Sequence, residues 1–371
     1  MIKVVVVDDS ALMRRVLTTL IEEDGDIAVV GVARDPLEAR ETIKAHDPDV
    51  VTLDIEMPNM NGLEFLEKIM RLRPMPVVMV SSLTTRSARE TMVALELGAV
   101  DFIAKPAGAG PGDREAMGQT LRQKIRDGAR TDVSSRALAR TRAQPRAPLN
   151  LKAPCPPGTL IALGASTGGV DAIRRVLEGL PADSPPVVIA QHMPAGFTTR
   201  FAARLDELVE LTVHEAEDRM ALLPGHAYVA PGDRHLLVER SSGALKCRVA
   251  GGELRSGHRP SVDILFASVA EVVGALAAGA ILTGMGRDGA EGLGRMRAAG
   301  AYTVGQAQGS ALIYGMPRAA AEIGAVAIEA PIEEIAGLLI SGLLGRREAG
   351  GHGDRQAARM AAGQGARRGE G

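Results

Sequence analysis

The sequence predicts an α/β protein built from two doubly wound parallel-sheet domains. Short apolar runs rich in Val and Ile alternate with stretches of helical length and period, which is typical of a sheet covered by helices. The runs are almost continuously hydrophobic, as strands are when both faces of a parallel sheet are buried. An Arg- and Pro-rich stretch in the middle of the 371 residues interrupts this alternation and divides the chain in two.

The composition excludes several classes of protein. The formal net charge is -2 and aromatic residues make up only 2% of the chain, so neither a nucleic-acid binder nor a base-stacking surface is indicated. Two cysteines cannot form a disulfide framework in a chain of this length. No apolar run reaches the roughly 18 residues of a membrane helix, and the N-terminus carries no signal-peptide pattern. We therefore expect a cytoplasmic protein that does not insert into membranes.

The first domain is expected over residues 1–122, and a flexible linker rich in Arg and Pro over residues 123–157. The predicted strands of the first domain are Ile2–Val7, Val29–Ala33, Val50–Leu53, Val77–Val80 and Asp101–Ala104. The predicted helices between them are Ala11–Glu23, Pro36–Ala45, Gly62–Arg71 and Thr84–Leu97.

The second domain is expected over residues 158–345, and a disordered tail rich in Gly, Ala and Arg over residues 346–371. The predicted strands of the second domain are Leu160–Leu163, Val187–Ala190, Leu211–His214, Ala227–Ala230, Leu236–Val238, Ala280–Thr283 and Ala301–Val304. Its predicted helices are Gly169–Gly179, Thr198–Leu208, Ser261–Ala277, Gly289–Ala299 and Ile332–Leu344. Turn residues at 232–233 and 241–243 join strands directly, so some antiparallel pairing is expected.

Acidic and basic residues follow the strands of the first domain. Asp8 and Asp9 follow its first strand, and Asp54 follows the third. Ser81 and Lys105 follow the fourth and fifth. Because the carboxyl ends of parallel strands meet in one crevice, the carboxylates would share a cation such as Mg²⁺, and an Asp beside it could attack phosphorus. Helix caps, a turn and a solvated lysine explain each residue singly, but they do not explain the whole set together.

These residues resemble the flavodoxin-like receiver domain of bacterial response regulators. The resemblance implies that Asp54 accepts a phosphoryl group from a histidine kinase. It also implies that Asp8, Asp9, Asp54 and the carbonyl of Glu56 hold Mg²⁺. In the same pattern Ser81 contacts the phosphoryl group and Lys105 is its charge partner.

A second group of residues indicates a serine hydrolase. The segment Gly164–Gly169 places Ser166 in a G-x-S-x-G turn between a strand and a helix, as a nucleophile elbow requires. Helix N-terminal N–H groups next to it suit an oxyanion. Two alternatives are that Ser166 only caps the helix, or that the turn binds a dinucleotide. The dinucleotide is disfavoured because the next strand ends in Gln191-His192 and not in an acid.

The partners of Ser166 are sought at other strand ends. His192 ends the next strand and is the first candidate for the general base, with His258 as the alternative. Asp288 follows a strand within a glycine-rich loop and could orient the imidazole, although an N-cap role is also open. Backbone N–H groups near Met285 could complete an oxyanion hole.

Four blocks closely resemble the chemotaxis protein-glutamate methylesterase (CheB) family: Gly164–Gly169, Gln191–Pro194, Gly257–Asp263 and Leu282–Gly289. The resemblance implies a triad of Ser166, His192 and Asp288, with the Met285 N–H as oxyanion donor and Thr167 beside the nucleophile. It implies demethylation of glutamate γ-methyl esters on methyl-accepting chemotaxis receptors, with methanol released, and glutamine deamidation in some members. We expect a monomer with no cofactor at the esterase site. One departure is Ala307-Gln308, where many members carry an acidic pair.

The domain order suggests regulation by phosphorylation. The unphosphorylated receiver is expected to cover the Ser166 crevice, and phosphorylation of Asp54 to favour an open state. The alternative is a response regulator whose second domain is a non-catalytic binding module. A DNA-binding output is disfavoured, because the chain shows no basic recognition helix.

Overall fold

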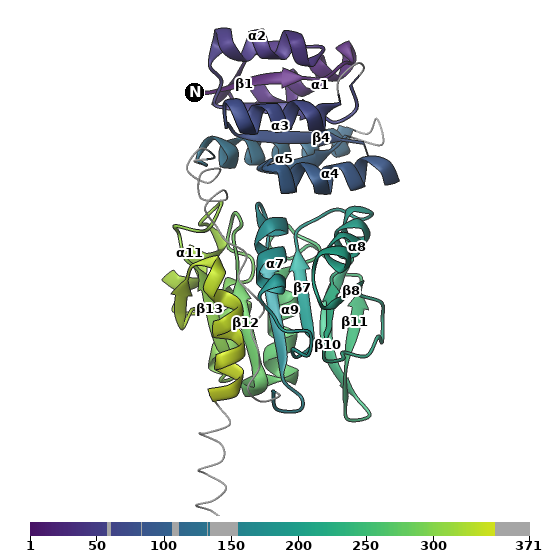
Figure 1. Cartoon of the computed structure of the whole chain (residues 1–371), viewed down its shortest axis with the longest axis vertical. Coiled ribbons are helices and arrows are strands. Elements are labelled where there is room, and N and C mark those ends of the chain that lie inside the picture. The colour runs from purple at the N-terminus through teal and green to yellow at the C-terminus, as the bar shows by residue number, and fades with distance from the viewer. Residues whose placement is uncertain (58–60, 83, 106–110, 132, 134–154, 346–371) are drawn as a thin grey trace, which may run out of the picture.

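The computed structural model describes residues 1–57, 61–82, 84–105, 111–131, 133 and 155–345, which form two stacked α/β domains (Figure 1). The greater part of the predicted linker and all of the predicted tail lie outside these residues. Within the described part of the chain, no helix is long and apolar enough to cross a membrane.

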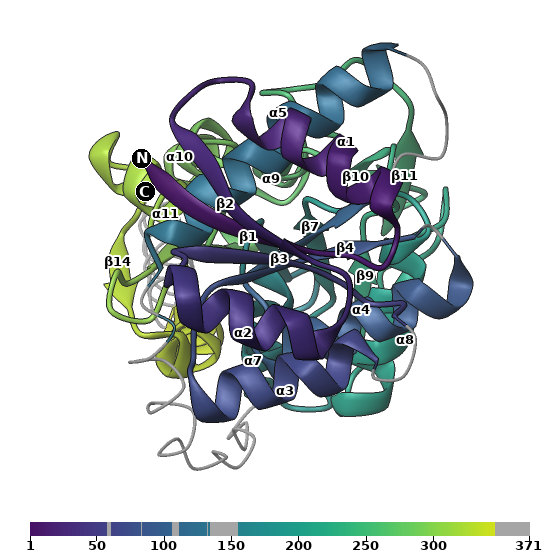
Figure 2. The same cartoon turned by 90° about the horizontal axis from the view of Figure 1, so that it is seen from above.

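The first domain is a five-stranded parallel sheet with the strand order β2-β1-β3-β4-β5. Helices α1 and α5 cover one face, and α2, α3 and α4 cover the other (Figure 2). Every residue of β3 and β4 is buried, as expected for strands covered on both faces. The strands are β1 (Ile2–Val7), β2 (Ile27–Ala33), β3 (Val50–Asp54), β4 (Val77–Ser81) and β5 (Asp101–Ala104). The helices are α1 (Ala11–Glu22), α2 (Pro36–His46), α3 (Gly62–Leu72), α4 (Thr85–Leu97) and α5 (Pro111–Ala129).

Helix α5 corrects the predicted start of the linker. It continues to Ala129, so the first residues assigned to the linker, 123–129, are helical. Its buried apolar side chains are Met117, Leu121 and Ile125, which are spaced four residues apart. This stripe is too narrow to stand out in the sequence, and the helix becomes stable only when it packs on the sheet.

The second domain is a seven-stranded parallel sheet with the order β14-β13-β12-β6-β7-β9-β8, and the antiparallel hairpin β10-β11 lies beside it. Its strands are β6 (Leu160–Ala165), β7 (Val187–Gln191), β8 (Thr212–Glu215), β9 (His226–Val229), β10 (His235–Ser241), β11 (Ala244–Ala250), β12 (Ala277–Ile281), β13 (Tyr302–Gln306) and β14 (Ile328–Ala330). Its helices are α7 (Gly169–Glu178), α8 (Phe197–Leu208), α9 (Val262–Val272), η1 (Gly274–Leu276), α10 (Ala290–Ala298), α11 (Met316–Glu322) and a helix over 332–345. The predicted fold class, including some antiparallel pairing, is confirmed.

Alternate residues of the central strand β6 face two different cores. Ile161 and Leu163 pack with α7, α8 and the helix over 332–345. Leu160 and Ala162 pack on the opposite face with α9, α10 and α11. The sheet is therefore covered on both sides, and its loops of chemical interest lie at the ends of the strands.

Several boundaries in this domain differ from the prediction, and β11, α11 and β14 have no predicted counterpart. The largest difference is at the end of one helix. The predicted helix Ser261–Ala277 ends at Val272, and Ala277 already begins β12. Between them Gly274 has a φ of 58°, a conformation that stops the helix. The Ala-rich composition around this boundary fits a buried strand and a helix equally well, so periodicity could not locate it.

The first domain lies across the carboxyl end of the second sheet, and α4 faces α7 and α8 (Figure 1). Arg204 of α8 binds Glu96 of α4 through two bonds, Nε to Oε1 at 2.7 Å and Nη2 to Oε2 at 2.9 Å. The rings of Phe102 and Phe197 have centroids 4.5 Å apart. One buried apolar cluster is continuous from the first domain into the second.

Candidate active site

Three carboxylates and one lysine meet at the carboxyl edge of the first sheet. Asp8 and Asp54 are buried and Asp9 is exposed, and one oxygen of each lies within 4.8 Å of the others. Lys105 Nζ lies 2.7 Å from Asp54 Oδ2 and 2.9 Å from Asp8 Oδ2. One ammonium group cannot balance three carboxylates. The residues therefore fit a hard cation with oxygen ligands, such as Mg²⁺.

Burial dominates the electrostatics of Asp54. It raises the pKa of Asp54 to about 6, although the hydrogen bond and the charge of Lys105 act in the opposite direction. Burial alone would lower the pKa of Lys105, but its hydrogen bonds and charge interactions with Asp54 and Asp8 raise it. A cation beside Asp54 would favour its ionised, nucleophilic form.

Ser81 and Glu56 connect this cluster to α4. The Ser81 hydroxyl is buried, and it accepts a hydrogen bond from Thr91 Oγ1 at 2.9 Å. Glu56 N donates to Asp54 Oδ1 at 3.3 Å, and the Glu56 carboxylate accepts a bond from Ser87 Oγ at 2.7 Å. Both Thr91 and Ser87 belong to α4, so the residues around Asp54 contact the helix that faces the second domain.

In the second domain, Ser166 occupies the turn between β6 and α7. Gly168, the N-cap residue of α7, has a φ of 78°, and a Cβ at this position would lie 2.6 Å from Leu312 Cβ. Only glycine fits this conformation and this close contact. Ser166 N donates to the carbonyl of Thr283 at 3.0 Å, so the turn is attached to the loop after β12.

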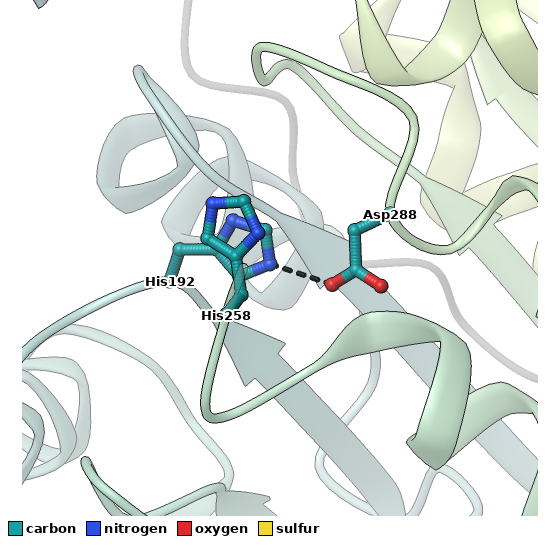
Figure 3. A group of neighbouring side chains, drawn as sticks. All are labelled: His192, His258 and Asp288. Atoms are coloured by element: carbon teal, nitrogen blue, oxygen red, sulfur yellow. Dashed lines mark hydrogen bonds and ion pairs between the residues drawn. The ribbon is translucent and has the colours of Figure 1, made fainter. Parts of the chain in front are cut away.

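His192 and Asp288 follow the two strands on either side of the strand that precedes Ser166. His192 follows β7 and Asp288 follows β12, and these two strands flank β6 in the sheet. His192 Nε2 lies 2.7 Å from Asp288 Oδ2 (Figure 3). His192 Nδ1 is buried and has no hydrogen-bond partner among the described residues. Since Nε2 is occupied by Asp288, Nδ1 is the ring nitrogen left to accept a proton.

The buried carboxylate of Asp288 is surrounded by donors. Burial alone would raise the pKa of Asp288, but hydrogen bonds from His192, Val262 N and Ser261 Oγ together lower it to about 2. Val262 N donates to Oδ2 at 2.7 Å and Ser261 Oγ donates to Oδ1 at 2.8 Å. Asp288 therefore accepts bonds from the N-terminus of α9, in addition to orienting His192. The predicted alternative, in which it caps the helix that follows it, does not describe these contacts.

The loop after β12 carries the predicted oxyanion donor. A Cβ on Gly284 would lie 2.7 Å from Ser166 Cβ, so this loop passes directly against Ser166. Thr283 is buried and binds through its hydroxyl to the carbonyl of Thr167 at 3.0 Å. Among the described residues, no acceptor binds the N–H of Met285. That N–H is available to a substrate oxyanion next to Ser166.

The two domains share one cavity of about 670 Å³. Ser166, His192 and Thr283 line one side, and Asp101 and Phe102 of the first domain line the other. Thr167 Oγ1 donates to Asp101 Oδ2 at 2.6 Å, and both side chains are buried. Thr167, predicted to contact substrate, is thus bound to the first domain in this structure.

Sequence reasoning did not foresee the role of Asp101 as a partner of Thr167. It reads as the first residue of a strand, and its partner lies 66 positions away in the chain. Lys124 of α5 also contacts it, with Nζ 2.7 Å from Asp101 Oδ1. A charged residue at the start of an apolar strand was the available signal, but it did not identify a partner.

His258, the alternative base, lies flat against His192. The ring centroids are 3.7 Å apart and the planes differ by 9° (Figure 3). Atoms of His192, His258 and Asp288 lie within 4.8 Å of one another, a distance that could suit a metal. A metal ion lies close to the plane of each imidazole that binds it, and two parallel stacked rings cannot both satisfy this condition at one point. The absence of a cofactor here stays a prediction.

Ala307-Gln308, the pair that departs from the family pattern, lies at the edge of the same cavity. Ala307 lines it, and Gln308 is exposed. Ala307 N donates to the carbonyl of Ala330 at 2.8 Å, which fixes the chain after β13. Ala307 therefore lines the same cavity as Ser166 and His192.

The fold and the site describe a class of protein: an α/β domain in which a serine, a histidine and an aspartate follow three neighbouring strands, stacked on an α/β domain with an acidic cluster beside a lysine. Residues 4–111 match the response regulator receiver domain family, and residues 161–339 match the CheB methylesterase family.

Relatives of known name agree with this class. The chain is 57% identical over 326 residues to protein-glutamate methylesterase/protein-glutamine glutaminase 1 of Caulobacter vibrioides, and the alignment covers 88% of this chain and 93% of that protein. It is 50% identical over 330 residues to the corresponding protein of Escherichia coli K12, covering 88% and 92%. The Thermotoga maritima CheB methylesterase catalytic domain is 35% identical with a TM-score of 0.49, covering 50% of this chain and 98% of that one. The chain belongs to the CheB family of receiver-linked methylesterases, and the predicted resemblance is confirmed.

The raised pKa of Asp54 generates a stability prediction. The pKa is about 6 in the folded protein against an ordinary value of 3.8. The protonated Asp54 carboxyl therefore makes its full contribution to the free energy of unfolding below about pH 4, and this contribution is lost as the pH rises through 6. Asp54→Asn should therefore raise the free energy of unfolding by roughly 1–3 kcal/mol near pH 7.5, and by less than about 1 kcal/mol near pH 4. Denaturant unfolding of the full chain in EDTA measures this. Asp9→Asn, at the exposed acid, is the control, and an equal gain at both pH values would contradict the assignment.

Proposed function

We propose that this chain is a phosphorylation-regulated hydrolase that demethylates glutamate γ-methyl esters on methyl-accepting chemotaxis receptors. The observation that carries the proposal is the triad-like arrangement of Ser166, His192 and Asp288 at the ends of three neighbouring strands, with a 2.7 Å bond between His192 and Asp288. The names of the relatives support the choice of substrate.

The chemistry follows from which imidazole nitrogen is free. Ser166 Oγ attacks the ester carbonyl and its proton passes to His192 Nδ1, because Nε2–H is held by Asp288. The N–H of Met285 stabilises the oxyanion. His192 then returns the proton to the departing methoxide, which leaves as methanol. Water, activated by the same nitrogen, attacks the acyl-enzyme and releases the glutamate side chain and free Ser166.

Glutamine deamidation is the second candidate reaction. The relatives are also named protein-glutamine glutaminases, which favours it. A glutamine side chain would form the same acyl-enzyme with loss of ammonia in place of methanol. Methoxide is the better leaving group, so we rank the esterase reaction first.

The first domain would control access to this site. A histidine kinase of the chemotaxis system would phosphorylate Asp54, with Mg²⁺ held by Asp8, Asp9, Asp54 and the carbonyl of Glu56 and supplying charge neutralisation for the phosphoryl oxygens. Lys105 would pair with a phosphoryl oxygen, and the Ser81 hydroxyl would donate to another. We propose that the unphosphorylated domain covers the cavity, and that the enzyme is a cytoplasmic monomer that binds neither nucleic acid nor the bilayer.

Ser166→Ala tests the hydrolase against the alternative of a binding module. Loss of the nucleophile should reduce methanol release from methylated receptor membranes by about 10³-fold or more, because no other group can form the acyl-enzyme. Ser341→Ala, at an exposed position on the helix over 332–345 of the same domain, should leave turnover unchanged. Methanol is measured by gas chromatography. Unchanged turnover in Ser166→Ala would favour the binding module.

A variant that breaks the ion pair between Arg204 and Glu96 tests whether the first domain covers the cavity. Glu96→Gln removes the interdomain carboxylate and should raise methanol release by the unphosphorylated protein about 2- to 5-fold, since a half-exposed pair contributes up to about 1 kcal/mol. With saturating phosphodonor the activity should match wild type.

The matched control for that experiment is Glu207→Gln. Glu207 is the other partner of Arg204, at 2.8 Å, and it belongs to the second domain itself. It should leave the basal activity unchanged. If both variants activate equally, or if neither does, the interdomain pair has no part in covering the site.

A further inference from the structure

The proposed triad gives no chemical role to the second imidazole in the site, that of His258. His258 stacks on His192 with ring centroids 3.7 Å apart (Figure 3). Its Nδ1 is buried and has no hydrogen-bond partner within the described residues. The side-chain bonds to Asp288 come from His192 and Ser261, so His258 lacks the carboxylate partner that a general base in this site would have. The face of its ring, and not its nitrogens, makes the contact with the triad.

The position of His258 is fixed by the loop between β11 and α9. Arg255 N donates to the His258 carbonyl at 3.1 Å, and His258 N donates back to the Arg255 carbonyl at 2.9 Å. Ser256 and Gly257, between them, both have positive φ angles, 52° and 80°, as a tight two-residue turn requires. This turn presents the imidazole on a rigid support.

The same loop also binds the carboxylate of the triad. Three residues beyond His258, the Ser261 hydroxyl donates to Asp288, and the N–H groups of Val262 and Asp263 donate to it as well. One short segment therefore contacts both members of the His192–Asp288 pair. A displacement of the loop would disturb the imidazole and the carboxylate together.

The stacked ring is neutral near pH 7. Burial, and next the proximity of His192, lower the pKa of His258 to about 4, against the opposing charge of Asp288. When His192 takes the proton from Ser166 it therefore faces an uncharged aromatic ring. Such a face attracts a cation, whereas a second imidazolium would repel it.

We propose that His258 is a positioning residue, whose flat ring sets the plane of the His192 imidazole so that its free nitrogen faces Ser166. The hydrogen bond to Asp288 holds the His192 ring at one edge, and the ring can still tilt about that edge. Contact over the whole face with His258 removes this freedom and excludes water from one side of the base. The inference rests on the proposed hydrolase function and adds a residue to it.

The test compares side chains that keep or remove the flat ring. His258→Phe keeps the ring without its nitrogens, and His258→Leu removes the ring at similar volume. In the full-length protein with Mg²⁺ and a phosphodonor, we expect kcat for methanol release within about 3-fold of wild type for Phe and about 10- to 100-fold lower for Leu. KM should change less than about 3-fold in both. If His258→Leu fails to fold, His258→Gln provides the variant without a ring.

A second readout separates this inference from the proposed function. A small fluorophosphonate labels an activated serine without requiring the receptor, so its rate of reaction with Ser166 should fall in His258→Leu by the same factor as kcat. The matched control is His214→Leu, which removes one ring of the other stacked pair, His214 and His226, at 5.2 Å and 11°. It should leave both rates unchanged.

Each outcome has one meaning. Equal losses in the Phe and Leu variants would show that a nitrogen of His258 is needed, and normal rates in both would show that the ring is dispensable; either overturns the positioning role. If wild type and Ser166→Ala react equally with the fluorophosphonate, the proposed nucleophile is wrong and the inference falls with it. Labelling at Ser166 without methanol release would refute the substrate, while the labelling rates would still decide the role of His258.

Discussion

The organisation of the catalytic domain depends on one buried negative charge, the carboxylate of Asp288. An ionised carboxylate away from water is stable only when donors surround it. Here the donors are His192, the Ser261 hydroxyl and the first N–H groups of α9. These bonds fix the orientation of the imidazole and anchor the loop that begins α9. Burial raises the pKa of the neighbouring Asp263, and the charge of Asp288 adds to this effect, which favours a single negative charge at this point.

Two elements of the first domain, β5 and α4, contact both the acidic cluster and the second domain. β5 begins with Asp101 and Phe102, which contact Thr167 and Phe197, and it is followed by Lys105, which binds Asp54. Helix α4 binds Glu56 through Ser87 near its start, and it binds the second domain through Glu96 near its end. A change of charge at Asp54 therefore acts on two elements that reach the interface directly. A long chain of intermediate contacts is not required.

The sequence predicted residues whose position is set by topology. Ser166, His192 and Asp288 each follow an apolar strand, and parallel strands bring such positions together whatever the packing around them. It could not predict pairs created by the docking of one domain on the other. Glu96 and Arg204 both read as residues on a solvated helix face, and neither carries a signal for its partner 108 positions away. The stacking of His258 on His192 likewise depends on the course of a loop, which periodicity does not determine.

The side-chain contacts between the domains are of a size that one phosphoryl group could offset. On the proposed function, a receptor helix, roughly 10 Å across, is too wide for a cavity of about 670 Å³ that both domains line, so the domains would have to separate for turnover. Three side-chain contacts among the described residues join the domains beside the shared apolar cluster: one buried hydrogen bond to Asp101, one partly exposed ion pair and one aromatic contact, together of the order of 2–4 kcal/mol. A phosphoryl group that forms one to three charge-assisted hydrogen bonds supplies a differential free energy of that size.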